Sequence, residues 1–160
     1  MNGAWSLEDF TKELETAGIR YMLIGGQAIT LYGSPLVSYD FDFWVDSSQR
    51  KDFLRVADES GFEYDNTAAS SKPLVIFYAE EEKIDVFFAK KMTTLVGSSI
   101  DFQECYQRAI LLKDVSGLTV RVPDIDDLIS LKTCKKKQSA KDAEDIEYLE
   151  IIKKRLRKKS

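Results

Sequence analysis

Two acidic residues separated by one hydrophobe, Asp40 and Asp42, carry the strongest chemical signal in the sequence. They belong to residues 40–45, DFDFWV, where acids and hydrophobes alternate with a period of two residues, as is typical of a β-strand. Successive side chains of a strand point to opposite faces, so both carboxylates lie on one face. Adjacent carboxylates repel each other, and a divalent cation with oxygen ligands would relieve that repulsion. A solvated strand face, or acids that keep an edge strand from pairing, are the alternatives.

The segment before this strand adds a candidate phosphate site. The apolar run at residues 21–24, YMLI, predicts a strand that ends at Gly25-Gly26, and a helix is expected from there to about Tyr32. Glycine lets the backbone approach a ligand closely, and the free amides at a helix N-terminus bind phosphate groups. A plain tight turn would explain the two glycines about equally well.

A third carboxylate, Asp85, interrupts the otherwise apolar strand predicted at residues 84–88. Together with the apolar run at 74–78, this strand flanks the sequence EEEK at 80–83, which favours a β-hairpin. A carboxylate facing the core without a partner would be costly, so Asp85 either lies on the solvent face or is paired. Three carboxylates on two adjacent strands, all facing one helix N-terminus, would form a cup for two metal ions with a triphosphate between them.

Helices are expected to pack around these strands. Ser6, with Asp9 three residues later, has the capping-box pattern that begins a helix. Ser47 or Ser48 is expected to cap a second helix, and residues 65–72 are expected to form a polar loop. These helices would cover the sheet and fix the positions of the acidic strands.

The C-terminal part is predicted to be helical. Pro123-Asp124 opens a helix that is expected to end near the lysine run at 135–137, and Ser139 with Asp142 repeats the capping-box pattern before a final helix. The basic residues at 153–159 favour a solvated helix end, with an RNA-binding tail as the alternative.

Charge is unevenly distributed along the chain. Residues 131–160 hold 11 Lys and Arg against 5 Asp and Glu, whereas the preceding 130 residues hold 12 against 22. A length of 160 residues fits one domain. We therefore expect a core at residues 1–122 and a helical segment at 123–160 packed on it.

The composition narrows the chemistry because the chain contains no histidine. Ser-His-Asp and Cys-His nucleophile systems and most zinc and non-haem iron sites are excluded on that ground. Catalysis would use carboxylates, lysines, backbone amides and a bound metal, which points toward magnesium-dependent phosphoryl chemistry.

Cys105 and Cys134 lack C-x-x-C spacing and are expected to be reduced. No apolar run approaches the ~20 residues of a membrane span, and the N-terminus lacks signal-peptide features, so a cytoplasmic location is expected.

These motifs, in this order, resemble the nucleotidyltransferase fold of the DNA polymerase β superfamily. The likeness is strongest to its small stand-alone bacterial members, the AbiEii-like or minimal type. The matching stretches span nearly the whole chain and are residues 24–28 (IGGQA), 38–45 (SYDFDFWV), 83–87 (KIDVF), 122–132 (VPDIDDLISLK) and 141–146 (KDAEDI). The resemblance implies an α+β fold with a central mixed sheet flanked by helices and C-terminal helices.

The resemblance also implies roles for the residues of these motifs. Gly25 and Gly26 would hold the triphosphate of a nucleoside triphosphate (NTP). Asp40 and Asp42 would ligate two Mg²⁺ ions, and Asp85 would ligate one of them and help to activate the acceptor hydroxyl.

Further positions match the nucleotide-binding parts of such proteins. Ser38 keeps a hydroxyl where threonine is usual, and Lys132 and Lys141 match lysine positions of the family pattern, although helix-end charge explains both lysines about equally well. Leu36 stands where small members often carry arginine, and leucine cannot neutralise a phosphate.

Two functions follow from this resemblance. The first is a magnesium-dependent nucleotidyltransferase that moves a nucleoside monophosphate from an NTP to a hydroxyl of RNA such as tRNA, of a protein or of a small molecule. The alternative is a catalytically decayed protein of the same fold that acts as a binding partner in a toxin-antitoxin pair, with Leu36 marking the decay. In either case a protein partner or a homodimer is expected to complete the pocket, and no membrane is involved.

Overall fold

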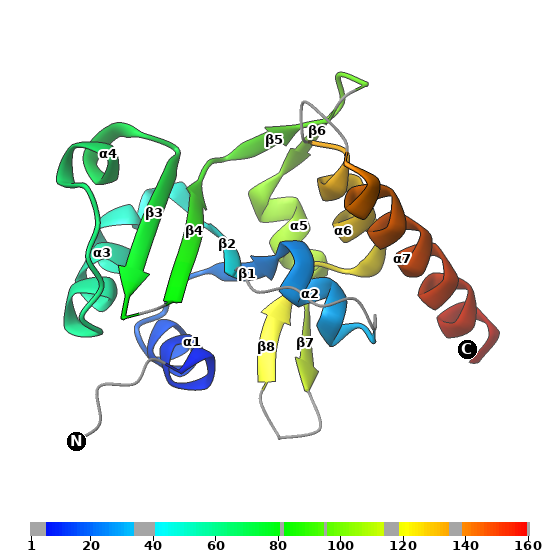
Figure 1. Ribbon diagram of the computed structural model, residues 1–160, viewed down its shortest axis with the longest axis horizontal. Helices are drawn as coiled ribbons and strands as arrows, with labels where there is room; N and C mark the ends of the chain where they lie inside the picture. Colours follow the sequence, from blue (N-terminus) through cyan, green and yellow to red (C-terminus); the bar gives the residue numbers. More distant parts are fainter. Residues whose placement is uncertain are drawn as a thin grey trace.

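A computed structural model describes residues 6–33, 41–80, 82–94, 96–113, 119–134 and 139–159 of the chain (Figure 1). Its centre is a four-stranded sheet in the order β1-β2-β4-β3. Strands β1 (Tyr21–Ile24) and β2 (Phe41–Val45) are antiparallel, β2 and β4 (Glu82–Phe88) are parallel, and β4 and β3 (Leu74–Ala79) are antiparallel. The sheet is therefore mixed, as the predicted α+β class requires.

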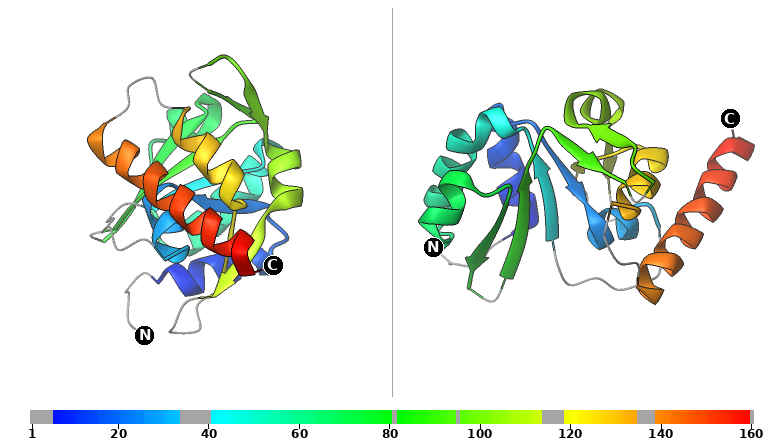
Figure 2. Two further views of the ribbon diagram at one scale, coloured as in Figure 1. Left: turned by 90° about the vertical axis from the view of Figure 1, so that its right-hand side faces the viewer. Right: turned by 90° about the horizontal axis from the view of Figure 1, so that it is seen from above.

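One face of the sheet packs against three helices, α1 (Leu7–Thr16), α3 (Arg50–Glu59) and α4 (Asn66–Ser71) (Figure 2). Aromatic rings dominate this core and meet edge to face, with ring centroids 5.7 Å apart for Phe10 and Phe43. Such pairs add about 0.5–1.5 kcal/mol each beyond the burial of their apolar area. The core therefore fixes β2 by its alternate residues and turns Asp42 to the other face.

The other face of the sheet is covered at β1 and β2 by a second apolar cluster. Met22 and Trp44 pack there against Phe102 of helix α5 (Phe102–Arg108) and Leu131 of helix α6 (Ile125–Lys132). The indole Nε1 of Trp44 donates a hydrogen bond of 2.8 Å to the carbonyl oxygen of Ala89. This second apolar cluster lies on the face of the sheet that also carries Asp42 and Asp85.

Two small hairpins complete the β structure. Strands β5 (Lys91–Thr93) and β6 (Ser99–Asp101) pair antiparallel, as do β7 (Ile110–Lys113) and β8 (Thr119–Val122). Helix α5 begins at Phe102, directly after β6.

Two local predictions were wrong because nearby side chains provide better caps. Residues 65–72 form helix α4 and not a polar loop, since the Asp65 carboxylate accepts hydrogen bonds from the Thr67 and Ala68 amides. Neither Ser47 nor Ser48 caps the helix after β2. Asp46 caps the short 3₁₀ helix η1 (Ser47–Gln49) that precedes α3.

The Asp46 carboxylate is buried and belongs to a longer-range network. Burial alone would raise the pKa of Asp46, but hydrogen bonds from Ser48, Arg20 and Gln103 lower it below its usual value. The Arg20 Nε and Gln103 Nε2 donors each lie 2.8 Å from Asp46 Oδ2. The carboxylate thus joins the residue before β1 and the end of β2 to α5.

Helix α7 (Ala140–Lys159) packs beside α6 (Figure 2). Its N-terminus has the predicted capping box: Ser139 Oγ accepts from the Asp142 amide at 3.1 Å, and Asp142 Oδ2 accepts from the Ser139 amide at 3.0 Å. Helix α6 also contacts α2 (Gly25–Leu31), which follows β1 directly. None of the described helices combines the length and apolar composition needed to cross a membrane.

Candidate active site

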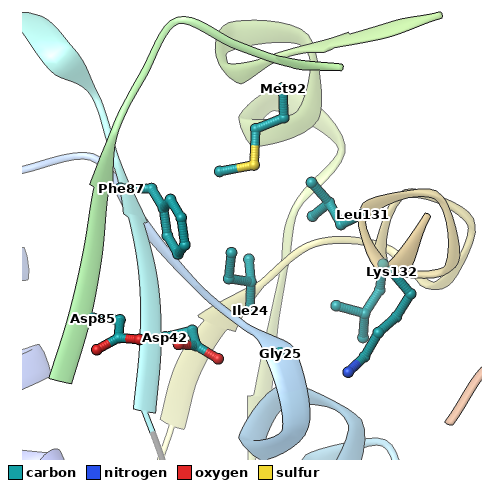
Figure 3. A pocket seen from close by; sticks show the side chains of 9 residues that line it. Ile24, Gly25, Asp42, Asp85, Phe87, Met92, Leu131 and Lys132 are labelled. Carbon is teal, nitrogen blue, oxygen red and sulfur yellow. The ribbon is translucent and has the colours of Figure 1, made fainter. Parts of the chain in front are cut away.

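Strand register brings two of the three predicted carboxylates together. Asp42 of β2 is the register partner of Asp85 on the parallel strand β4, and of Ile24 on β1. Register partners point to the same face of a sheet, so the two carboxylates lie side by side (Figure 3). Asp40 and Ser38 lie outside the described residues.

Gly25 has the conformation and the space that only glycine satisfies. Its φ of +73° lies in the left-handed region, and a Cβ at this position would overlap Asp42 Oδ2. Gly25 is also the first residue of α2, whose N-cap residue, Ile24, provides no side-chain hydrogen bond to the helix. The start of α2 therefore directly adjoins the Asp42 carboxylate, and the amides at a helix N-terminus can bind a phosphate.

Gly25→Ala is expected to lower catalytic turnover about 10²-fold, because the added methyl group must displace the Asp42 carboxylate, and small misplacements at a reacting centre cost that much. The substitution should also lower the stability of the fold by roughly 1–2 kcal/mol, because a residue other than glycine is strained at positive φ. Gly18→Ala is the matched control, since Gly18 has a φ of +72° and a Cβ added there would meet no described atom within 4 Å. Thermal unfolding should then show similar losses for both variants, while turnover should fall only for Gly25→Ala. Equal turnover in the two variants would contradict the importance of the contact.

Asp85 lies off the core face and has a nearby cation. Its side chain is 23% exposed, and the Lys83 ammonium lies 3.4 Å from its Oδ1 atom. Asp85 Oδ1 is itself buried and accepts no hydrogen bond from the described residues. An ammonium group at this distance offsets the charge of the carboxylate only in part, and a metal cation would compensate that charge further.

The carboxylates open into a pocket of about 300 Å³ between the sheet, β5 and α6 (Figure 3). Its lining consists of Ile24, Gly25, Asp42, Asp85, Phe87, Met92, Leu128, Leu131 and Lys132. Four of the predicted site residues therefore meet in one cavity: Gly25, Asp42, Asp85 and Lys132.

Lys132 is held at the pocket by buried acids of α7. Its Nζ lies 2.8 Å from Asp145 Oδ2 and 3.5 Å from Asp142 Oδ1, and its side chain is only 8% exposed. Lys141 is half exposed, lies 3.6 Å from Asp145 and is not part of the pocket lining. Gly26, the second residue of α2, is not part of the lining either.

The apolar lining was not predicted as part of the site. Phe87 could have been found, because it lies two residues after Asp85 on the same strand and so shares its face. Met92, Leu128 and Leu131 carry no such signal, since apolar residues on α6 and β5 look the same in sequence whether they fill a core or line a pocket.

The described residues suit a divalent cation only in part. They include no group of three or more acidic, cysteine or histidine side chains placed to hold a metal ion. Asp42 and Asp85 supply two carboxylates on one face, and the third predicted ligand, Asp40, precedes the described part of β2. Two adjacent carboxylates on one face of the sheet fit an oxygen-liganded cation.

The arrangement is that of the nucleotidyltransferase fold, as comparison with solved structures shows. The structure of lincosamide antibiotic adenylyltransferase LnuA with lincomycin bound matches with a TM-score of 0.65 at 16% identity, over 94% of this chain and 99% of that chain. A Thermotoga maritima protein with an inferred nucleotidyltransferase activity matches with a TM-score of 0.60 at 14% identity, over 95% and 91% of the chains. ANT(2")-Ia in complex with adenylyl-2"-tobramycin matches with a TM-score of 0.58 at 13% identity, over 94% of each chain.

The family itself is defined by sequence. A family model described as "Nucleotidyl transferase of unknown function (DUF2204)" matches residues 5–160, and the chain belongs to this family. The predicted fold class and the assignment to a nucleotidyltransferase enzyme are thereby confirmed. The AbiEii-like subtype stays a prediction. Comparison with curated proteins gave no match.

Proposed function

We propose that this protein is a magnesium-dependent enzyme that transfers a nucleoside monophosphate from an NTP to a hydroxyl group of a small molecule. The observation that supports this proposal best is the register pairing of Asp42 with Asp85, directly beside Gly25 at the start of α2. This places two carboxylates next to backbone amides that can bind phosphate.

In this proposal Asp40, Asp42 and Asp85 are the ligands of two Mg²⁺ ions. When bound, the ions would neutralise charge that develops on the phosphate and lower the pKa of the attacking hydroxyl. The carboxylates orient the ions and the phosphate, and Asp85 would also accept the proton of the acceptor hydroxyl. The Lys83 ammonium lies 3.4 Å from Asp85 and offsets part of the negative charge of the two carboxylates.

Gly25, Gly26 and Lys132 would bind the triphosphate. The backbone of Gly25 can come close to a phosphate because the residue has no side chain, and Lys132 brings a positive charge to the same cavity. Ser38 and Lys141 remain candidates for the same role, Lys141 through its ion pair with Asp145.

A small-molecule acceptor is favoured over RNA or protein by the solved structures of this fold. One is an adenylyltransferase of lincosamide antibiotics with lincomycin bound, and another holds adenylyl-2"-tobramycin. Both ligands carry hydroxyl groups, as the acceptor of this reaction must. We further propose that residues 123–160 complete the pocket formed by a core at 1–122, because Leu131 and Lys132 of α6 line it. A partner protein or a second copy would then cover its open side.

Binding can be tested before the acceptor is known. Thermal unfolding should be recorded with each of the four NTPs, with Mg²⁺ and with the metal removed by a chelator. A ligand at ~100 times its dissociation constant adds about 2.7 kcal/mol of stability, which raises the midpoint by several degrees in a domain of this size. We expect such a rise with Mg²⁺ and its loss on chelation.

The same measurement distinguishes an active nucleotidyltransferase from a decayed protein of the same fold. A decayed protein that only binds a partner predicts no metal-dependent stabilisation by any NTP, and that outcome would contradict the proposal. If binding is found, products formed with a panel of hydroxyl compounds and with RNA, measured by mass spectrometry, would identify the acceptor class.

A further inference from the structure

The pocket is divided into a charged end and an apolar end. Among the described residues that line it, only Asp42, Asp85 and Lys132 have side chains that can form hydrogen bonds or ion pairs. In Figure 3 they lie toward one end of the pocket, with Asp42 and Asp85 side by side on the sheet and Lys132 across from them. Phe87, Met92 and Leu131 surround the other end. A ligand that fills the whole pocket must therefore be charged at one end and apolar at the other.

Phe87 is the residue best placed to contact a flat ligand. It follows Asp85 by two residues on β4, so its ring lies on the face of the sheet that carries the carboxylates. The ring is partly buried against the second apolar cluster, and in Figure 3 it points into the pocket. Met92 of β5 lies across the pocket, and its polarizable thioether makes favourable contacts with aromatic rings.

An NTP is charged at its triphosphate and has a largely apolar ring face at its base, so it matches the charged and apolar ends of the pocket. If the triphosphate lies at Asp42 and Gly25, as the proposed function requires, the base extends from the charged end. A nucleobase is a flat ring, and stacking on an aromatic side chain is the interaction that holds any base with little regard to its identity.

We infer that the apolar end is the nucleobase site of this enzyme, with Phe87 as the stacking residue, and that it accepts all four bases. Selection between ATP and GTP requires groups that read the hydrogen-bonding edge of the base, because a buried polar group left unpaired is what rejects the wrong ligand. The described side chains at this end provide none. The inference rests on the proposed function, since it requires that an NTP binds in this pocket.

The test is to measure dissociation constants for ATP, GTP, CTP and UTP, each with Mg²⁺, by isothermal titration calorimetry. Stacking of one base corresponds to about 1 kcal/mol or more, so Phe87→Leu should weaken binding of every NTP at least about fivefold. For the wild type, the constants for ATP and GTP should agree within about tenfold. Inorganic tripolyphosphate, which has no base, should bind wild type and variant equally well.

Leu74→Ala is the matched control. Leu74 is the register partner of Phe87 on β3, faces the same side of the sheet and is 40% exposed, but it does not line the pocket. This variant should bind all four NTPs like the wild type. Met92→Ala, on a separate hairpin, provides a second test if Phe87→Leu impairs folding, and should also weaken every NTP.

The outcomes distinguish the inference from the function on which it rests. Unchanged NTP affinity in both Phe87→Leu and Met92→Ala, or a preference above 100-fold between ATP and GTP, would overturn the nucleobase site and leave the nucleotidyltransferase proposal intact. Absence of any NTP binding to the wild type would overturn both.

Discussion

Asp42→Asn is expected to lower the rate of pyrophosphate release from NTP by about 10²- to 10³-fold, because a preorganised charge next to the transferring phosphate is worth two to three orders of magnitude. The substitution keeps the size of the side chain and its register beside Asp85 and Gly25. It removes one negative charge, so a metal ion held between Asp42 and Asp85 would lose half of its described carboxylate ligands. Turnover should be measured with Mg²⁺, saturating NTP and a panel of small hydroxyl compounds.

The control for this variant is Asp52→Asn. Asp52 lies in the first turn of α3 with its side chain 49% exposed, and it is not part of the pocket. The same chemical change should leave its turnover within a factor of about two, because single exposed ion pairs contribute little. Full turnover in Asp42→Asn would remove Asp42 from the catalytic site and with it the central observation of the proposed function.

The parts of the fold that could be predicted are those set by short-range rules. The alternation of acids and hydrophobes predicted β2, and the capping patterns at Ser6 and Ser139 predicted the starts of α1 and α7. Each of these patterns depends only on side chains within three residues of one another. The pairing of Asp42 with Asp85 followed from a family pattern and not from spacing alone. The structure supplies its physical basis, a parallel register between β2 and β4.

The parts that could not be predicted depend on contacts far apart in sequence. The contacts of Asp46 with Arg20 and Gln103 were missed because these partners lie 26 and 57 residues away. The apolar end of the pocket was missed because Met92 and Leu131 resemble core residues until β5 and α6 are seen to leave a cavity between them. Long-range packing decides whether an apolar residue fills a core or lines a site.

Lys132→Met is expected to lower the free energy of unfolding by about 3–5 kcal/mol, the usual cost of breaking a buried ion pair by removing one partner. The change leaves Asp145, whose side chain is 1% exposed, with the more distant and half-exposed Lys141 as a weaker partner. Asp142 loses less, because Ser139 still donates to it through its amide and its hydroxyl. Urea unfolding monitored by circular dichroism would measure the loss.

Lys141→Met makes the same chemical change at the exposed cation of this cluster. It should cost less than about 1 kcal/mol, because exposed ion pairs are screened by water. Equal losses in the two variants would mean that burial of Lys132 does not control the energy of the cluster.

A double variant separates the structural role of Lys132 from its proposed role in binding. Replacing Lys132 with Met and Asp145 with Leu removes both charges of the shortest pair, and exchange of a buried ion pair for apolar residues is often neutral, so most of the lost stability should return. The pocket then has a stable wall but no ammonium group. If Lys132 binds the triphosphate, this variant should still bind magnesium NTP at least about tenfold more weakly than the wild type, since a hydrogen bond to a charged group is worth about 1.5–3 kcal/mol. Affinity equal to that of the wild type would mean that Lys132 serves only to join α6 to α7.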